Sequence, residues 1–291
     1  MDLVTHVKSH PRPGDTVLGS DMQMFPGGKG ANQAVAAAKA GASVKMLGKL
    51  GKDAHGKRLR DSLELASVDT NLVSEVDTPS GVAFITVDSQ AQNMIVVSSG
   101  ANRQLRPEDI HALSFEGIEL ILTQLESPLD TVEALATAAH QNRVPILLNA
   151  APANDLSAEL LSKLDYLVVN EGEAELLSEI SVSDKKSAKE AAKKLTDKGV
   201  SNVIVTLGGN GLVWAGESES ELEAHKVKVV DTTAAGDAFC GALAAHLSRG
   251  MSLTEALSFA NAAGALATTK LGAQPSLPSQ DDIETIMAAS D

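Results

Sequence analysis

The 291-residue sequence has very little cysteine and few aromatic residues. Its single cysteine, Cys240, excludes an internal disulfide framework and a zinc site built from several thiolates. Cys240 falls inside a predicted helix, where the role of a small buried apolar side chain is favoured over that of a reactive thiol. Because aromatic residues make up only 2% of the chain, the core must be built mainly from Ala, Val, Leu and Ile.

Long apolar runs and a surplus of positive charge are also lacking. No stretch approaches the roughly 18 apolar residues of a membrane-spanning helix. The N-terminus shows no basic segment followed by an apolar one, so we expect a cytoplasmic protein with no membrane partner. The formal net charge of −14 argues against nucleic acid as the main partner. A phosphate-bearing ligand stays compatible with this charge, because backbone dipoles and a few lysines bind it locally.

Hydrophobic patterning predicts an α/β protein with a small additional sheet. Short apolar strands alternate with helices, which is typical of a parallel sheet covered on both faces. The predicted strands of this part are 44–47, 120–122, 146–148, 166–169, 203–205 and 227–230. The predicted helices are 33–40, 53–65, 130–141, 157–164, 187–198, 237–247, 253–268 and 280–289. A hairpin of 81–87 and 93–97 would form the small sheet with extended pieces at 3–7, 16–18 and 22–25.

The most informative stretch, 230–239, joins a β-rich run to a helix. Ala234, Ala235 and Gly236 are too small to shield their own backbone N–H groups. Successive free N–H groups at a helix start form an anion site, aided by the helix dipole. Asp237 follows in the first turn, where a carboxylate beside an anion site suits general-base activation of an alcohol that attacks a phosphate. A plain helix N-cap made by Asp and Thr is the alternative.

A second stretch, 27–33, is rich in glycine and precedes a helix. It lacks the Gly-Lys-[Ser/Thr] of a P-loop, and a dinucleotide fingerprint would need glycine in place of Gln33. The double glycine would let a small ligand touch the backbone, and Lys29 and Asn32 would suit the hydroxyls of that ligand. The alternative is a glycine-rich turn without a ligand.

Four predicted strands end in polar or glycine-rich segments. Ligands of such sheets bind beyond the carboxyl ends of the strands. Glu173 is placed to hold Mg²⁺ through water, although the acidic run 171–175 would also complement the dipole of a helix. The four segments are 124–128, 149–153, 170–175 and 206–211.

The two informative stretches resemble the signature motifs of the ribokinase-type (PfkB) carbohydrate kinases, and the likeness runs nearly end to end. It also covers 1–4, 13–17, 124–128, 149–153 and 272–276. The resemblance implies a three-layer α/β/α fold with a mostly parallel central sheet and a small β-sheet lid. A single kinase domain would span 1–291, with the lid formed by 3–25 and 78–98. A homodimer through the lid sheet is implied as well.

The resemblance further implies ATP-dependent phosphorylation of D-ribose at its 5-hydroxyl. Asp237 would be the catalytic base, and the backbone of Ala234, Ala235 and Gly236 would be the anion hole. Ribose contacts are implied for Asp2, Gly28, Lys29, Asn32, Glu126 and Asp237. Contacts to ATP and Mg²⁺ are implied for Asn170, Glu173, Thr206, Gly208 and Asn261. An activating monovalent cation, K⁺, would be held by Asp231, Thr233, Ala267, Lys270, Gly272 and Ser276.

The sequence departs from the family pattern in two places. Family members carry an apolar strand before the position of Met1, inside the central sheet. We therefore expect exposed apolar edges and a lost sugar contact, either in a piece of a longer protein or in a shortened form with impaired activity. Ala150 stands where proline is common, with little expected effect. Another pentose or nucleoside kinase, such as a deoxyribokinase, and a non-catalytic ribose-binding paralogue remain the competing functions.

Overall fold

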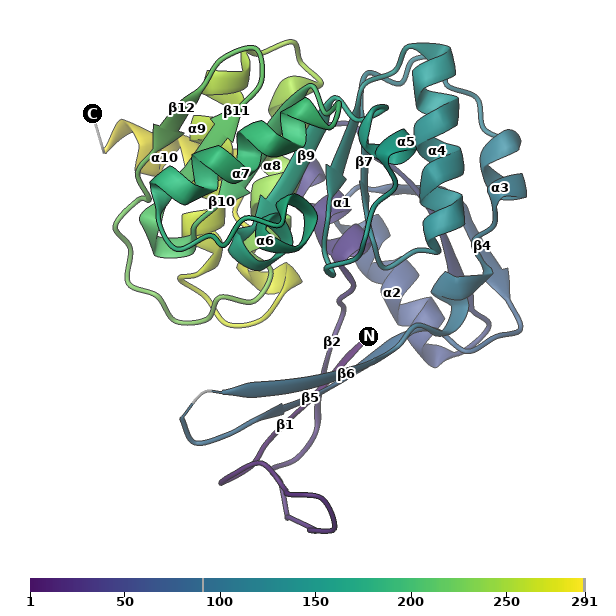
Figure 1. Ribbon diagram of the computed structural model, residues 1–291. Helices are drawn as coiled ribbons and strands as arrows, with labels where there is room; N and C mark the ends of the chain where they lie inside the picture. The colour runs from purple at the N-terminus through teal and green to yellow at the C-terminus, as the bar shows by residue number, and fades with distance from the viewer. Residues whose placement is uncertain (91, 290–291) are drawn as a thin grey trace.

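A six-stranded sheet forms the centre of the computed structural model, which describes residues 1–90 and 92–289 (Figure 1). Its strands are β7 (Ile121–Gln124), β8 (Ile146–Asn149), β9 (Tyr166–Asn170), β10 (Asn202–Thr206), β11 (Leu212–Ala215) and β12 (Ser220–Leu222). The order is β12-β11-β10-β9-β8-β7, with β7 to β10 parallel and the last two strands antiparallel. The parallel strands are apolar along most of their length because helices cover both faces.

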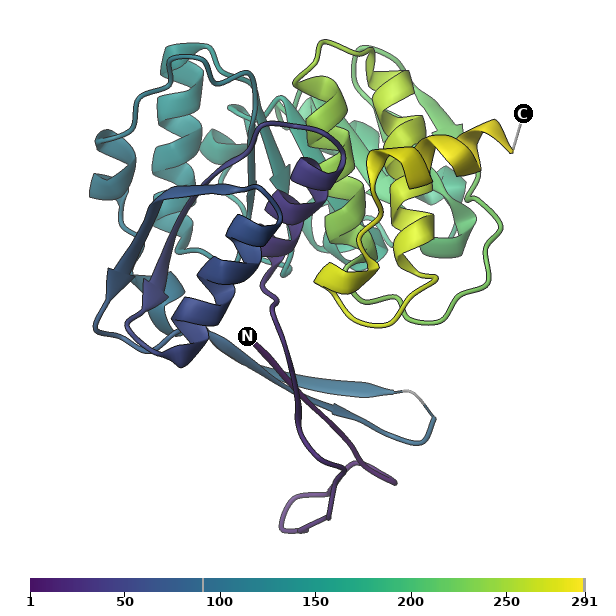
Figure 2. The same ribbon diagram turned by 180° about the vertical axis from the view of Figure 1, so that it is seen from behind.

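Helices cover this sheet in two layers. One face carries α4 (Leu129–Asn142), α5 (Ala158–Leu161), α6 (Glu171–Ser178) and α7 (Lys185–Asp197), in front in Figure 1. The other face carries α1 (Lys29–Lys39), α8 (Ala235–Leu247), α9 (Leu253–Ala267) and α10 (Gln280–Ala288), in front in Figure 2. The predicted three-layer α/β/α fold is confirmed. Within the described ranges, no helix combines the length and the apolar character that a membrane crossing requires.

A separate two-stranded parallel sheet stands beside β7. It consists of β3 (Lys45–Gly51) and β4 (Asp69–Val76), and α2 (Ala54–Leu65) packs against it. Among residues 1–90 and 92–289, no strand pairs with the outer edge of β7 or joins it to β3. The short α3 (Pro107–His111) packs on α4, and 3₁₀ turns occur at Gly100–Gln104, Gly208–Asn210 and Gln274–Ser276.

A small four-stranded sheet projects from the body (Figures 1 and 2). Its order is β2-β1-β5-β6, with β1 (Asp2–His6), β2 (Gln23–Phe25), β5 (Val82–Val87) and β6 (Asn93–Ser98). The predicted hairpin is confirmed, and its register runs from the pair Val82–Ser98 to the pair Val87–Asn93. The strand predicted at 16–18 is wrong, because these residues join no sheet.

The segment before α8 is a loop, so the strand predicted at 227–230 is also wrong. Val229 and Val230 are 59% and 50% exposed, and they gain little from burial. The loop is instead fastened to the end of α9, where the N–H groups of Val230 and Asp231 donate to the Thr268 carbonyl at 2.8 and 3.1 Å. The turn that carries the proposed anion hole is therefore held by a helix end and not by a sheet.

Helices α1 and α8 pack against each other with small side chains at the contact. A Cβ atom on Gly241 would lie 2.5 Å from the Ala36 Cβ and 2.6 Å from the Gln33 carbonyl oxygen. Only glycine allows the two backbones to come this close. Asp237 lies one turn before Gly241 on the same side of α8, so the contact brings the first turns of α1 and α8 together.

Candidate active site

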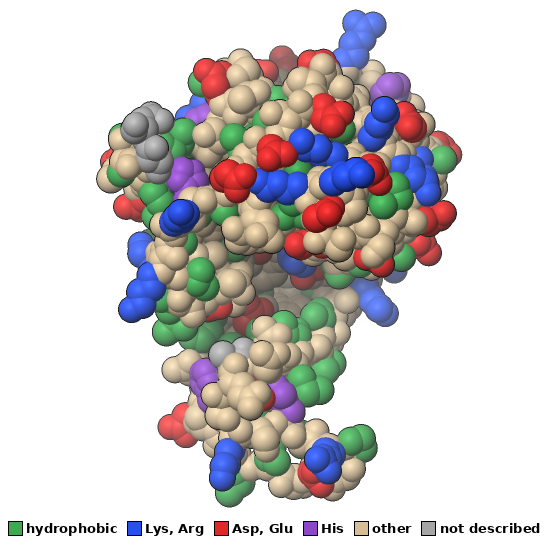
Figure 3. Space-filling model, turned by 60° about the vertical axis from the view of Figure 1, so that its left-hand side comes forward, with side chains coloured by type: hydrophobic (Ala, Val, Ile, Leu, Met, Phe, Trp, Pro, Cys, Tyr) green, Lys and Arg blue, Asp and Glu red, His purple; other side chains and the backbone are tan. Residues whose placement is uncertain are grey.

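A cavity of about 640 Å³ lies between the body and the small sheet. Figure 3 shows the hollow between these two parts of the molecule. The walls of the cavity include residues of β1, β3, β5 and β6 and the first turns of α1 and α8. All six residues predicted to bind the sugar line it: Asp2, Gly28, Lys29, Asn32, Glu126 and Asp237.

Asp237 lies at the inner end of this cavity and is only 6% exposed. Its Oδ2 accepts a hydrogen bond from Asn32 Nδ2 at 2.9 Å, and its Oδ1 accepts one from Gln33 Nε2 at 3.0 Å. Burial raises the pKa of the Asp237 carboxyl, while the Lys29 charge and the two amide hydrogen bonds act in the opposite direction. A buried carboxylate with a raised pKa is a stronger base than a solvated one, which suits proton abstraction.

Asn32 also offers an acceptor to a ligand. Its Oδ1 is buried and has no hydrogen-bond partner among the described residues, while its amide nitrogen is held by Asp237. A buried polar atom of this kind is costly unless something donates to it. A hydroxyl group beside Asp237 would satisfy it, which agrees with the sugar contact predicted for Asn32.

Glu126 and the start of α1 hold each other in place. Gly28 caps α1 with a φ of 98°, a conformation that glycine adopts readily, and the Lys29 N–H donates to Glu126 Oε2 at 2.9 Å. Burial raises the pKa of Glu126, the Lys29 hydrogen bond and charge oppose this, and the nearby Asp237 and Asp2 charges add to the rise. Burial also raises the pKa of Asp2.

The turn before α8 has two features of an anion site, and one of its N–H groups, that of Ala235, already donates to the Thr232 carbonyl at 3.3 Å. Ala234 occupies the cap position in the left-handed conformation with a φ of 61°, and no side chain caps the helix. Asp231 uses its carboxylate elsewhere, accepting from the Thr233 N–H at 2.9 Å and from the Gly272 N–H at 2.8 Å. The first N–H groups of a helix have no intrahelical partners, and a Cβ on Gly236 would meet nothing within 4 Å.

The same contacts bring together the loops predicted to hold a monovalent cation. Asp231 joins the loop before α8 to Gly272, and Thr233 is bound to Asp231 by both its N–H and its hydroxyl. Ala267 and Ser276 are 0% and 1% exposed, and the Ser276 hydroxyl donates to the Ala273 carbonyl. Lys270 is exposed.

The residues predicted on the nucleotide side lie at the ends of neighbouring strands. Asn170 and Thr206 end β9 and β10 and are paired in register. Asn170 and Glu173 cap α6 reciprocally: the Glu173 N–H donates to Asn170 Oδ1, and the Asn170 N–H donates to Glu173 Oε2, both at 2.9 Å. These contacts agree with the alternative interpretation of the acidic run 171–175, in which its charges serve the start of a helix. Gly208 begins the 3₁₀ turn after β10, and Asn261 on α9 donates to the Glu223 carbonyl at 2.7 Å.

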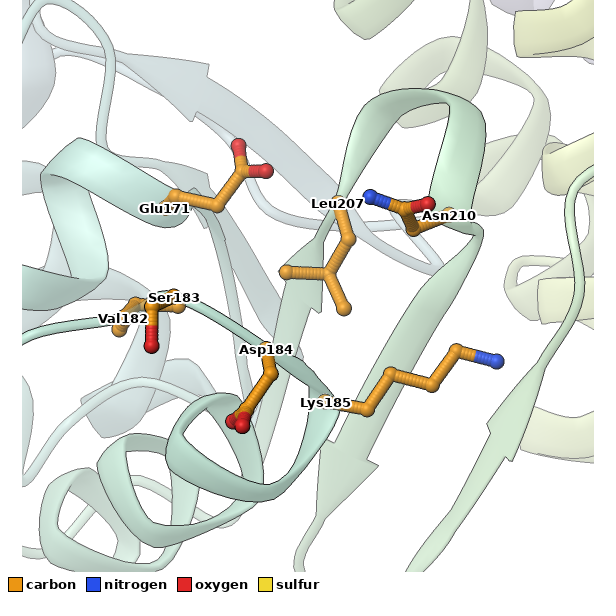
Figure 4. A pocket seen from close by; sticks show the side chains of 7 residues that line it. All are labelled: Glu171, Val182, Ser183, Asp184, Lys185, Leu207 and Asn210. Carbon is orange, nitrogen blue, oxygen red and sulfur yellow. The ribbon is translucent and has the colours of Figure 1, made fainter.

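A second cavity of about 340 Å³ lies beyond the β10 end (Figure 4). Glu171, Asp184 and Lys185 are its charged lining residues, and they do not converge on one point. Lys185 instead pairs with Glu221 at 3.4 Å and with Glu223. None of the residues that line this cavity is among those predicted to bind the sugar.

Comparisons with known proteins identify the class. The sequence profile of the pfkB family of carbohydrate kinases matches residues 1–280. The chain is 40% identical to a ribokinase of Haemophilus influenzae over 97% of its own length and 93% of the relative. It is 36% identical to a deoxyribokinase of Salmonella typhi over 100% and 97% of the two chains.

Among solved structures, the chain is similar to an Arabidopsis thaliana ribokinase complexed with ribose and ATP. The TM-score is 0.89 and the identity 30%, with 98% of this chain and 95% of that chain covered. The chain therefore belongs to the pfkB family of carbohydrate kinases and is an enzyme of the sugar kinase class. The resemblance inferred from the motifs is confirmed.

Two polar residues of the site were not assigned a role from the sequence. Gln33 served only to exclude a dinucleotide fingerprint, and Asn149 belonged to a polar strand end. In the structure Gln33 Nε2 donates to both Asp237 Oδ1 and Asn149 Oδ1, at 3.0 and 3.1 Å. The only signal in the sequence was a glutamine at the start of an alanine-rich helix.

The burial of Glu126 predicts a pH-dependent stability change. The pKa of this carboxyl is higher in the folded than in the unfolded chain, so the folded state holds the proton more tightly. The protein therefore loses stability as pH rises from the unfolded pKa to the folded pKa. We expect Glu126→Gln to raise the melting temperature near pH 7.5 and to leave it nearly unchanged near pH 4, in thermal unfolding at both pH values.

The matched control is Glu190→Gln, which makes the same chemical change on the exposed side of α7. Glu190→Gln should leave the pH dependence of the melting temperature as it is in wild type. Equal melting temperatures for wild type and Glu126→Gln at both pH values would show that the buried carboxylate is not a cost to folding.

Proposed function

We propose that this protein is an ATP-dependent ribokinase that transfers the γ-phosphoryl group of ATP to O5 of D-ribose. The observation that carries the proposal is the position of Asp237. Its buried carboxylate opens into the cavity lined by the predicted sugar-binding residues, and it stands in the first turn of a helix that no side chain caps. The similar A. thaliana enzyme complexed with ribose and ATP supports the choice of both substrates.

In the proposed reaction, Asp237 accepts the proton of the sugar 5-hydroxyl as that oxygen attacks the γ-phosphorus in line. The backbone N–H groups of Ala234, Ala235 and Gly236 stabilise the charge on the phosphoryl oxygens. Asp2, Gly28, Lys29, Asn32 and Glu126 hold the sugar hydroxyls. The small sheet acts as a lid, because water in the cavity would compete with the sugar for ATP.

We further propose that ATP binds at the ends of β9 and β10, through Asn170, Thr206 and Gly208, with Asn261 nearby on α9. Glu173 would hold Mg²⁺ through water in spite of its capping role, and the ion would offset the negative charge of the phosphates. Part of the carboxylate is free for this, because only its Oε2 accepts a hydrogen bond from the Asn170 N–H. A single kinase domain and a cytoplasmic location, where ATP is supplied, complete the proposal.

The deoxyribokinase relative from S. typhi supports a second candidate, phosphorylation of deoxyribose in the same cavity. The two sugars differ by one hydroxyl, and a site built to bind that hydroxyl rejects the analogue that lacks it. The ratio of kcat/KM for ribose and deoxyribose decides between the two. A ribose-binding paralogue without turnover is the third candidate, and thermal stabilisation by ribose without ATP consumption would identify it.

The first prediction concerns turnover and Asp237. We expect ATP consumption with D-ribose in potassium buffer, and Asp237→Asn should lower kcat by about 10²- to 10⁴-fold because general-base help is lost. Ribose affinity by calorimetry should change little, since Asn keeps the size of the side chain. Asp281→Asn on exposed α10 is the control and should be fully active. Loss of ribose binding in Asp237→Asn would make Asp237 a structural residue instead.

The second prediction concerns the monovalent cation. Asp231 fixes the positions of Thr233 and Gly272, and the loop that contains Thr233 leads to the proposed anion hole. Potassium should therefore raise kcat over sodium at equal ionic strength, and Asp231→Asn should weaken this response more than it weakens ribose affinity. Equal rates in the two salts would remove K⁺ from the proposal.

The third prediction concerns a homodimer through the small sheet. Its outer face carries Met24, Phe84, Met94 and Val96, which are 38%, 51%, 55% and 68% exposed and lie on one side by register. Sedimentation should show a dimer, because contiguous apolar surface of this kind marks an interaction site. Phe84→Asp should give a monomer, and Leu65→Asp at an exposed position of α2 should not. A monomeric wild type would end the dimer proposal.

A further inference from the structure

Each oxygen of the Asp237 carboxylate is held by a different amide. Oδ2 accepts from Asn32 Nδ2 and Oδ1 accepts from Gln33 Nε2. Asn32 has a second task, since its free Oδ1 faces a ligand hydroxyl in the proposed reaction. Gln33 does not line the cavity and is 1% exposed, so it has no contact available to the sugar.

The orientation of Gln33 is set by a chain of hydrogen bonds that begins in the central sheet. The Val168 carbonyl can only accept, so Asn149 turns its amide nitrogen toward it, at 3.3 Å. The Asn149 oxygen then points at Gln33, at 3.1 Å, and Gln33 must present its own amide nitrogen. The two hydrogens of that nitrogen serve Asn149 and Asp237, both of which are acceptors.

The residues at both ends of this series of hydrogen bonds are held in fixed positions. Asn149 ends β8 and is 8% exposed, and Val168 lies in the interior of β9 and is 2% exposed. On the other side, the contact at Gly241 fixes the distance between Gln33 on α1 and Asp237 on α8. A side chain whose rotamer is locked by packing and by a further hydrogen bond holds a reacting group within the narrow geometry that catalysis needs.

We propose that Gln33, oriented by Asn149, is a positioning residue that holds the Asp237 carboxylate in the orientation required to accept the proton of the substrate hydroxyl. This inference rests on the proposed function, because it assigns to Asp237 the role of base. The role differs from that of Asn32, which touches both the base and the sugar. Gln33 acts on the reaction only through Asp237.

The charges that face Asp237 come from several elements. Burial raises the pKa of Asp237 and the Lys29 charge on α1 opposes this rise, while the carboxylates of Asp2 on β1 and Glu126 after β7 lie close enough to interact with Asp237. The Cys240 thiol, one turn further along α8, is fully buried and has its pKa raised well above its ordinary value. Gln33 carries no charge, so its donated hydrogen bond favours the ionised carboxylate without adding a new titrating group.

The decisive variant is Gln33→Met, which keeps the length of the side chain and removes both donors. In the wild type and the variant, kcat and KM are measured from about pH 5 to 9. We expect the acid limb of the kcat profile to move up by about one pH unit, because a charge-assisted hydrogen bond to the carboxylate is lost. The plateau of kcat should fall and the KM for ribose should change less than about twofold, since Gln33 lies outside the cavity.

A second readout does not depend on turnover. Carbon-13 labelling of the aspartate carboxyls, with the Asp237 signal assigned by Asp237→Asn, gives the Asp237 titration directly in the ligand-free protein. The same upward shift should appear there. If the proposed function fails, wild type will be inactive on ribose, but Gln33→Met will still shift the titration of Asp237. If this inference fails, wild type will be active and Gln33→Met will leave the titration of Asp237 unchanged.

Two further variants separate positioning from packing. Gln33→Glu keeps the shape of the side chain and replaces the donated hydrogen bond with a second carboxyl, so it should move the acid limb in the same direction. Gln141→Met makes the same change at an exposed site on α4 and should leave the profile in place. Lower melting temperature in Gln33→Met without a shift in either pH profile would overturn the proposal and make Gln33 a packing residue.

Discussion

The close contact between α1 and α8 is the constraint on which the site depends. Gly241 lets the two backbones approach within a distance that any Cβ would prevent. This contact joins two motifs that are far apart in the sequence, since Asn32 and Asp237 are separated by 205 residues and still share a hydrogen bond. The glycine-rich start of α1 contributes the amides and the lysine, and the start of α8 contributes the proposed base and the proposed anion site. Neither helix forms the site alone.

This contact also sets an electrostatic balance. Asp237, Glu126 and Asp2 lie in one partly enclosed space, and burial raises the pKa of all three carboxyls. A base must have a raised pKa to take a proton, yet it must remain ionised at the working pH. The Lys29 charge and two donated amide hydrogen bonds oppose the effect of burial on Asp237. Neutral donors such as Gln33 do this without placing a second cation where the phosphoryl group would arrive.

The sequence was sufficient to predict the elements whose pattern is local. The parallel strands and the hairpin at 82–98 follow from apolar runs and turn residues, and the six residues that the family resemblance predicts for the sugar all line one cavity. The errors at 16–18 and 227–230 have a physical cause, since a β-rich run becomes a strand only where a neighbouring strand has a free edge. The link between Gln33 and Asn149 spans 116 residues and depends on how α1 lies on the sheet. No local pattern encodes such a contact.

In the small sheet, alternate residues of each strand form two different surfaces, the face toward the cavity and the outer face. Residues in a strand point alternately to opposite faces, so β5 directs Ile85 toward the cavity and Phe84 to the outside. Its partner β6 repeats this with Ile95 and Val96, and both outward residues are more than half exposed. The apolar side chains on the outer face of this sheet are partly exposed, so they stabilise it less than buried ones would. Burial of the outer face in the proposed dimer would therefore stiffen the sheet, and a stiffer sheet would close over the sugar as a unit. The same period-two pattern therefore underlies both the proposed lid and the proposed dimer.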